Sequence, residues 1–142
     1  MVPKQTANGE FMYDEKFYGY TLDELARMCH KELANVSGWK YVELRKGTFG
    51  YDNMVMSVGR VMRGGEKGEE GMARLVHEGW VSNYIFWRDT KHYMTNLEYV
   101  KPFNPLGDIR RELCAKLAYD ELPEDEKEKD LVIARVLIKV LV

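Results

Sequence analysis

The stretch YDELPEDEKEKD, residues 119–130, decides how the end of this chain folds. Its proline at position 123 suits the first turn of a helix, because the N–H that proline lacks has no partner there. The acids that follow favour the positive end of a helix dipole. The pattern predicts a helix from about residue 124, with a terminal strand as the alternative because of its β-branched content. Its core stripe would be Ile133, Val136, Leu137, Val140 and Leu141.

A second helix is predicted over residues 21–35. Thr21 can cap it, and Glu24 three positions later completes a capping box. The Ser37-Gly38 pair ends the pattern. One face carries the apolar stripe Leu22, Leu25, Ala26, Cys29 and Leu33.

Two more helices are predicted between these, at residues 72–89 and 108–119. The first would carry Val76, Trp80, Asn83 and Trp87 along one side, although Gly79 weakens it by about 1 kcal/mol relative to alanine. The second would point Ile109, Leu113 and Leu117 inward. Residues 90–105 are predicted to be irregular or a short strand between prolines.

A β-hairpin is predicted in the first half of the chain. Residues 39–46 have the composition of a strand, and residues 53–62 alternate with a period of two. The glycine-rich stretch 63–71 is predicted to be a loop. These elements define an α+β fold with about four helices and a small antiparallel hairpin or sheet.

A chain of 142 residues fits one domain with a real core. We expect an N-terminal arm at residues 1–20 and one domain at 21–142. The segments LARMCH, residues 25–30, and MARLVH, residues 72–77, share a chemical pattern. A degenerate duplication of 21–65 and 72–142 is therefore open, as is chance similarity between two helices.

Composition excludes several classes of protein. A net charge of −2 gives no field that would draw the chain to a nucleic acid polymer or a membrane. The polar start predicts no secretory signal. Cys29 and Cys114 are too few for a disulfide scaffold, so free thiols and a cytoplasmic location are expected.

Residues 72–142 resemble the ryanodine-receptor-type (RyR) domain of calcium-release channels and of many bacterial and phage proteins. That family has a helix motif LA-x-x-(I/V)-H-x-x-W and later P-Y-x-E-L-P-E-x-E-K-x-x-D. The first is matched by Ala73, Val76, His77 and Trp80. The second is matched by Tyr119, Glu121, Leu122, Pro123, Glu124, Glu126, Lys127 and Asp130. The family's G-W-x-Y follows the first helix here, at 38–41, and Ala118 replaces its proline.

The resemblance implies a compact α+β module without catalysis, whose bacterial members look like sensors or binders of nucleotide-derived ligands. We therefore expect non-enzymatic binding of a small nucleotide-derived ligand. The chain would sequester it like a sponge, for instance as a phage anti-defence protein, or act as a sensor. The alternative is a structural or interaction protein such as a phage particle component, and a homo-oligomer is open.

Six residues are the candidate ligand contacts. His77 and Trp80 share a helical face and offer a ring stack and a hydrogen bond. Aromatic faces also suit a purine, although most aromatic side chains in a small domain serve as core. Arginine can hold a phosphate, although solvated helix faces also carry it. The remaining candidates are Trp39, Tyr41, Tyr119 and Arg74.

No catalytic, metal or cofactor motif is found. The histidines and cysteines lack metal-ligand spacing, and the acids at 120–130 lack the spacing of a calcium loop. The glycines at 64–71 match neither phosphate-binding pattern. We therefore expect no enzyme activity, no cofactor and no metal.

Overall fold

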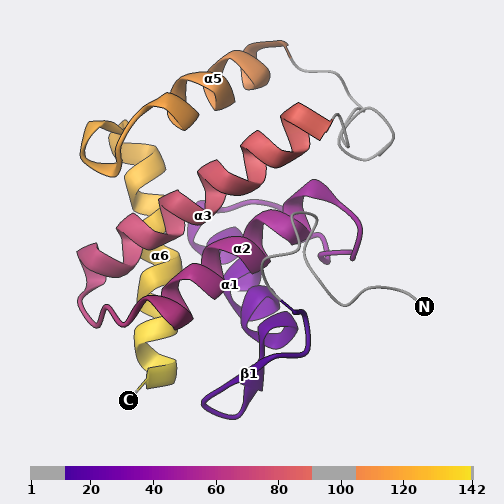
Figure 1. The fold of residues 1–142 in the computed structure, drawn as a ribbon, viewed down its shortest axis with the longest axis vertical. Helices are drawn as coiled ribbons and strands as arrows, with labels where there is room; N and C mark the ends of the chain where they lie inside the picture. Colours follow the sequence, from indigo (N-terminus) through magenta and orange to yellow (C-terminus); the bar gives the residue numbers. More distant parts are fainter. Residues whose placement is uncertain (1–11, 91–104, 142) are drawn as a thin grey trace.

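The computed structural model describes residues 12–90 and 105–141. This part is mainly helical, with five α-helices and one small antiparallel sheet (Figure 1). The elements are β1 (Lys16–Phe17), β2 (Tyr20–Thr21), α1 (Leu22–Ser37), α2 (Phe49–Gly64), α3 (Glu69–Thr90), α5 (Pro105–Lys116), the 3-10 helix η2 (Tyr119–Glu121) and α6 (Glu124–Leu141).

Helix α3 runs across the middle of the molecule (Figure 1). It contacts α2 most extensively, α6 next, and α5 along a narrower side, while α1 packs against α2 and α6. One hydrophobic core joins these helices, and its fully buried members include Leu22, Tyr51, Met56, Met72 and Leu137. Every large surface of the core is therefore a helix–helix contact.

Helix α1 forms as its local sequence predicts. The Thr21 hydroxyl accepts a hydrogen bond from the Glu24 N–H at 3.1 Å, and the Glu24 carboxylate accepts one from the Thr21 N–H at 2.9 Å. Gly38 ends the helix with a φ of 72°, a conformation that glycine adopts without strain. The whole predicted stripe from Leu22 to Leu33 is buried, so the prediction is confirmed.

The hairpin predicted at 39–62 is wrong. Residues 39–45 form no strand; the Arg27 guanidinium and the His30 ring hold the carbonyls of Leu44 and Val42, at 2.7 and 2.6 Å. Residues 53–62 belong to α2, which Thr48 caps. Helix α2 is buried on nearly all sides, so apolar residues stand at both even and odd positions of residues 53–62. Their alternation therefore did not distinguish a strand from a buried helix.

The small sheet lies earlier in the chain. Strands β1 and β2 pair Lys16 with Thr21 and Phe17 with Tyr20. These residues belong to the predicted arm, and Phe17 and Tyr13 pack against the core. The rest of that arm, residues 1–11, lies outside the described residues, as do residues 91–104 of the predicted irregular stretch.

Helix α5 presents a different face from the predicted one. Ile109 and Leu113 are 66% and 53% exposed, whereas Cys114 is buried. Glu112 on the same helix accepts hydrogen bonds from Tyr84 and Arg88 of α3, at 3.0 Å each. Polar contacts and one thiol thus hold α5 on α3, while Leu117, just past the helix, packs against the core as predicted.

Helix α6 confirms the helical prediction and excludes the terminal strand. Ile133 and Leu137 are buried, and the other stripe residues are half-buried against the core. The helix is tied to α3 by Arg135, which pairs with Glu69 at 2.8 Å. The loop before α3 is shorter than predicted, because α2 extends to Gly64 and α3 begins at Glu69.

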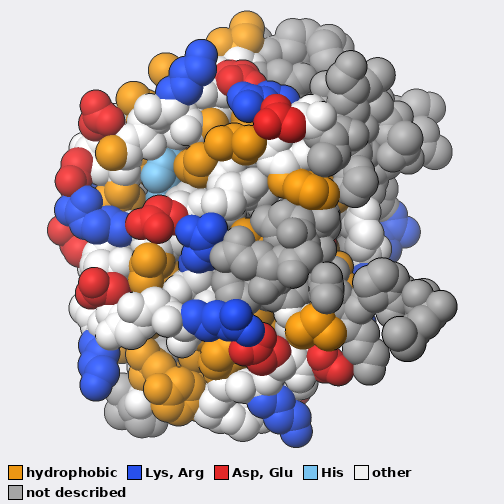
Figure 2. Space-filling model, viewed as in Figure 1, with side chains coloured by type: hydrophobic (Ala, Val, Ile, Leu, Met, Phe, Trp, Pro, Cys, Tyr) orange, Lys and Arg blue, Asp and Glu red, His pale blue; other side chains and the backbone are white. Residues whose placement is uncertain are grey.

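The surface carries both charge signs. Figure 2 shows acidic and basic side chains interspersed, with hydrophobic side chains between them, and no large field of one sign on this face. Within residues 12–90 and 105–141, none of the helices has the length and apolar character needed to cross a membrane.

Candidate functional site

The candidate site is a cavity of about 300 Å³ that all five described helices help to line. Its volume is at the lower end of the range for small-molecule sites. The apolar part of the wall includes Leu33, Leu44, Met54, Val76, Leu122 and Ile133. The polar and aromatic part includes His30, Trp39, Asn53, Ser57, His77, Trp80, Cys114, Glu126, Lys129 and Asp130.

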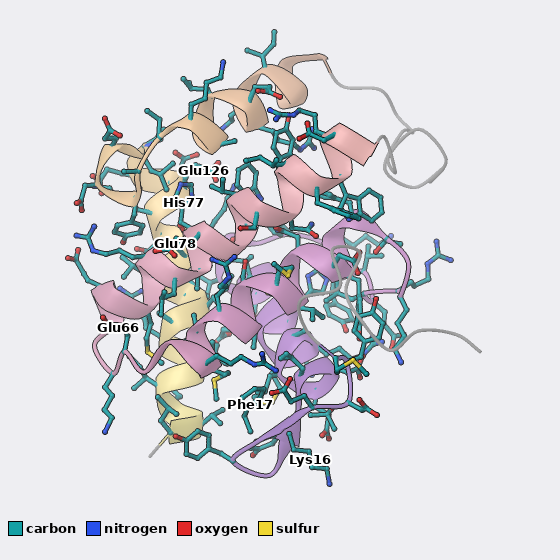
Figure 3. The ribbon with its side chains drawn as sticks, in the orientation of Figure 1. Lys16, Phe17, Glu66, His77, Glu78 and Glu126 are labelled. Atoms are coloured by element: carbon teal, nitrogen blue, oxygen red, sulfur yellow. The ribbon has the colours of Figure 1, made fainter. Side chains whose placement is uncertain are left out.

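Helix α3 supplies a stack of rings to this wall. The His77 and Trp80 rings lie 6.2 Å apart and nearly parallel, and Trp80 stacks on Tyr84 at 5.4 Å. The His77 Nε2 lies 2.7 Å from the Leu117 carbonyl, which can only accept, so this nitrogen carries the proton. Figure 3 shows His77 close to Glu126 of α6. The imidazole is therefore fixed in position and tautomer.

Trp39 forms a more exposed part of the wall. Its side chain is 48% exposed, and the Lys129 ammonium lies 5.7 Å from the centre of its ring. The same lysine pairs with Glu126 at 3.2 Å. Trp39 also borders a second hollow, a groove of about 850 Å³ between α1 and α6. The indole thus lines both the cavity and the groove.

The two similar segments, residues 25–30 and 72–77, make similar contacts. His30 and His77 both line the cavity, and both bond a backbone carbonyl through Nε2. Arg27 lies 5.5 Å from the centre of the Tyr51 ring, and Arg74 lies 5.4 Å from that of Tyr119. The cavity therefore lies between the two helices that carry these segments.

Three of the six predicted contacts meet at the cavity, namely His77, Trp80 and Trp39. Tyr41 lines the neighbouring groove instead.

Arg74 and Tyr119 lie outside both hollows. Arg74 makes a bidentate pair with Asp120, at 2.8 and 2.7 Å, and covers the ring of Tyr119. Tyr119 is buried. These two side chains fix the turn before α6.

The sequence did not point to the least satisfied polar groups of the cavity. Asn53 Oδ1 is buried and has no hydrogen-bond partner among the described residues. The Asp130 carboxyl makes no hydrogen bond or ion pair within the described part of the chain. Asn53 was not predicted as a site residue because residues 53–62 were wrongly predicted to form a strand. Asp130 stands three residues before Ile133, and that helical spacing to a core residue was the available signal.

Burial governs the ionisation of the site. It raises the pKa of Asp130 to about 8, the charge of Glu126 raises it further, and Lys129 opposes the rise. Burial also raises the pKa of Cys114 and of Cys29, so both stay thiols rather than reactive thiolates. In the described residues, no group of three histidine, cysteine or acidic side chains could hold a metal ion.

Comparison with known proteins gives no relative. No family model matches the chain, and neither a curated protein nor a solved structure matches it.

Proposed function

We propose that the protein binds a small nucleotide-derived ligand in the central cavity without catalysing a reaction. The observation that carries the proposal is one cavity lined by the Trp39 indole, by Asn53, whose Oδ1 is buried without a partner among the described residues, and by the Asp130 carboxyl. Aromatic faces stack on a nucleobase, and unpartnered buried polar groups favour a ligand that hydrogen-bonds to them.

The ligand class comes from the resemblance of residues 72–142 to the RyR domain, which stays a prediction. The cavity supports the base of such a ligand rather than its phosphate. Its wall carries Glu126 and Asp130 against Lys129, which is already paired. Arg27, Arg74, Arg88, Arg110 and Arg135 each pair with a carboxylate. A phosphate group is therefore expected to lie outside the cavity, toward solvent.

Binding without turnover fits two roles. The protein would sequester its ligand, as a phage anti-defence sponge does, or report the ligand to a partner as a sensor. In both, the His77 ring is held by its contact with the Leu117 carbonyl, so this part of the wall needs no rearrangement before the ligand binds. A cytoplasmic location stays a prediction.

Titration calorimetry with mono-, di- and cyclic nucleotides tests the proposal. Trp39→Ala should raise the Kd at least about fivefold, because base–aromatic stacking is worth about 1–3 kcal/mol. Tyr41→Ala is the control, since Tyr41 lines only the groove. Loss of binding in the Tyr41 variant alone would move the site to the groove, and no binding of any nucleotide at millimolar concentration would contradict the function.

The groove favours a second candidate function, a structural or interaction protein. Trp39 and Tyr41, each 48% exposed, line it together with Met28, Val136 and Val140. Exposed aromatic patches of this kind are typical of protein contacts. Gel filtration with light scattering tests this: assembly without ligand that Tyr41→Ala weakens supports it, and a ligand-free monomer contradicts self-assembly.

A further inference from the structure

The unpartnered groups of the cavity define which ring it can hold. Asn53 Oδ1 offers an acceptor from α2, and the Asp130 carboxyl lines the same cavity from α6. Buried polar groups are normally hydrogen-bonded, so a ligand donor that reaches Asn53 Oδ1 would remove an existing cost. The half-buried Asp130 carboxyl offers a second polar contact in the same cavity. The required edge follows from the protonation state of Asp130.

Several titratable groups lie around Asp130. His30, His77 and Cys114 line the cavity from α1, α3 and α5. Glu126 and Lys129 face Asp130 from its own helix, and Tyr119 is near enough for its ionisation to sense the Asp130 charge. Since burial and Glu126 outweigh Lys129, the pKa of Asp130 rises to about 8. At neutral pH the carboxyl is therefore mostly protonated, with an O–H donor beside a C=O acceptor.

We propose that the cavity selects a flat ring whose edge holds a ring-nitrogen acceptor beside an exocyclic amino group, with Asp130 as the selecting residue. Asp130 would donate to the ring nitrogen and accept from the amino group. Asn53 Oδ1 would accept the second amino hydrogen, and the half-exposed Trp39 indole would stack on one face of the ring. This inference rests on the proposed function and names its ligand class: an aminopurine or aminopyrimidine base.

The chemistry distinguishes the four common bases. Adenine and cytosine carry the acceptor beside the amino group. On its Watson–Crick edge, guanine presents two adjacent donors, which suit an ionised carboxylate. Its N3 acceptor also lies beside the amino group, but on the edge next to the sugar, where GMP leaves less room for Asp130. Uracil has no amino group. A site that hydrogen-bonds one edge rejects a ligand lacking it, because buried polar groups are then left unpaired.

Calorimetry with AMP, CMP, GMP and UMP tests the inference on wild type, Asp130→Asn and Asp130→Ala. The asparagine amide holds a donor beside an acceptor and imitates the neutral acid, so it should keep AMP and CMP binding. Alanine should weaken both by about tenfold or more. Above pH 8, wild-type affinity should fall by about tenfold per pH unit, whereas the asparagine variant should show no such fall. Asp125→Asn on the same helix, away from the cavity, is the matched control.

The outcomes separate the two ideas. Tightest binding of GMP, or wild-type affinity for AMP that rises above pH 8, overturns the inference and leaves the function standing. So does equal binding of all four bases by all variants. No binding of any nucleotide overturns the function and the inference together. If Asp130→Ala does not fold, the pH profile of Asp130→Asn decides.

Discussion

Gly79→Ala is expected to destabilise the protein, although alanine is the better helix former. A Cβ atom at position 79 would lie 2.6 Å from the Ser57 Cα and 2.7 Å from the Met56 carbonyl oxygen. Both atoms belong to the backbone of α2, so no side-chain rotation can relieve the overlap. Relaxed carbon contacts lie near 3.5–4.0 Å, so α2 and α3 must separate by about 1 Å.

The size of the effect follows from three contributions. Overpacking of a rigid contact costs about 1–3 kcal/mol. Separation also stretches the 3.0 Å hydrogen bond from the Ser57 hydroxyl to the Val76 carbonyl, which is worth about 1 kcal/mol. Replacing glycine within a helix returns about 1 kcal/mol. The free energy of unfolding should therefore fall by about 2 kcal/mol.

Urea unfolding followed by far-UV circular dichroism measures this change. Gly71→Ala is the matched control on the same helix, because its Cβ would meet only the end of the flexible Glu66 side chain. That variant should equal or exceed the wild type in stability. A Gly79→Ala protein as stable as Gly71→Ala would refute the close α2–α3 crossing.

Three further predictions use the same assay. Thr21→Ala removes the cap of α1 and should lower the free energy of unfolding by about 1 kcal/mol; an unchanged value would mean that the capping box contributes nothing. Leu137→Ala, fully buried, should cost about 2–5 kcal/mol, whereas Leu113→Ala, half-exposed, should change stability by less than about 0.5 kcal/mol; similar losses would contradict the orientation of α5. Asp130 binds its proton more tightly folded than unfolded, so its contribution to stability should decline from about pH 4 to about pH 8. Asp130→Asn should remove that decline, and unchanged pH profiles would contradict the raised pKa.

The elements that sequence predicted well are those with local determinants. The Thr21–Glu24 capping box, the Gly38 terminus and the acidic start of α6 are each complete within a few residues. The strand prediction for residues 53–62, which belong to α2, was wrong because the surroundings of this helix, rather than its own sequence, decide which of its faces are buried. Thr48 does cap α2, so one local signal for the helix was present.

The residues of the candidate site also fall into two groups, those placed by local sequence and those placed by tertiary packing. His77 and Trp80 share a helix, and their spacing alone placed them on one face. Asn53 reaches the cavity only because α2 packs beside α3, and Asp130 only because α6 packs behind both. Arg74 was predicted from its chemistry, but its partner Asp120 lies 46 residues away, and that pairing depends on the tertiary fold.

The two similar segments, residues 25–30 and 72–77, connect the fold to the site. In both segments the leucine or methionine, the alanine and the residue before histidine enter the core, the arginine covers a tyrosine, and the histidine bonds a carbonyl. These shared contacts position His30 and His77 on α1 and α3, facing one cavity. Asn53 comes from α2, which follows α1, whereas Asp130 comes from α6, which follows α3 only after α5 and η2. His30 and His77, which the two similar segments share, already bond backbone carbonyls. Asn53 and Asp130, which lie outside both segments, are the groups of the wall left for a ligand. If a ligand binds here, its recognition should depend on these two groups rather than on what the segments share.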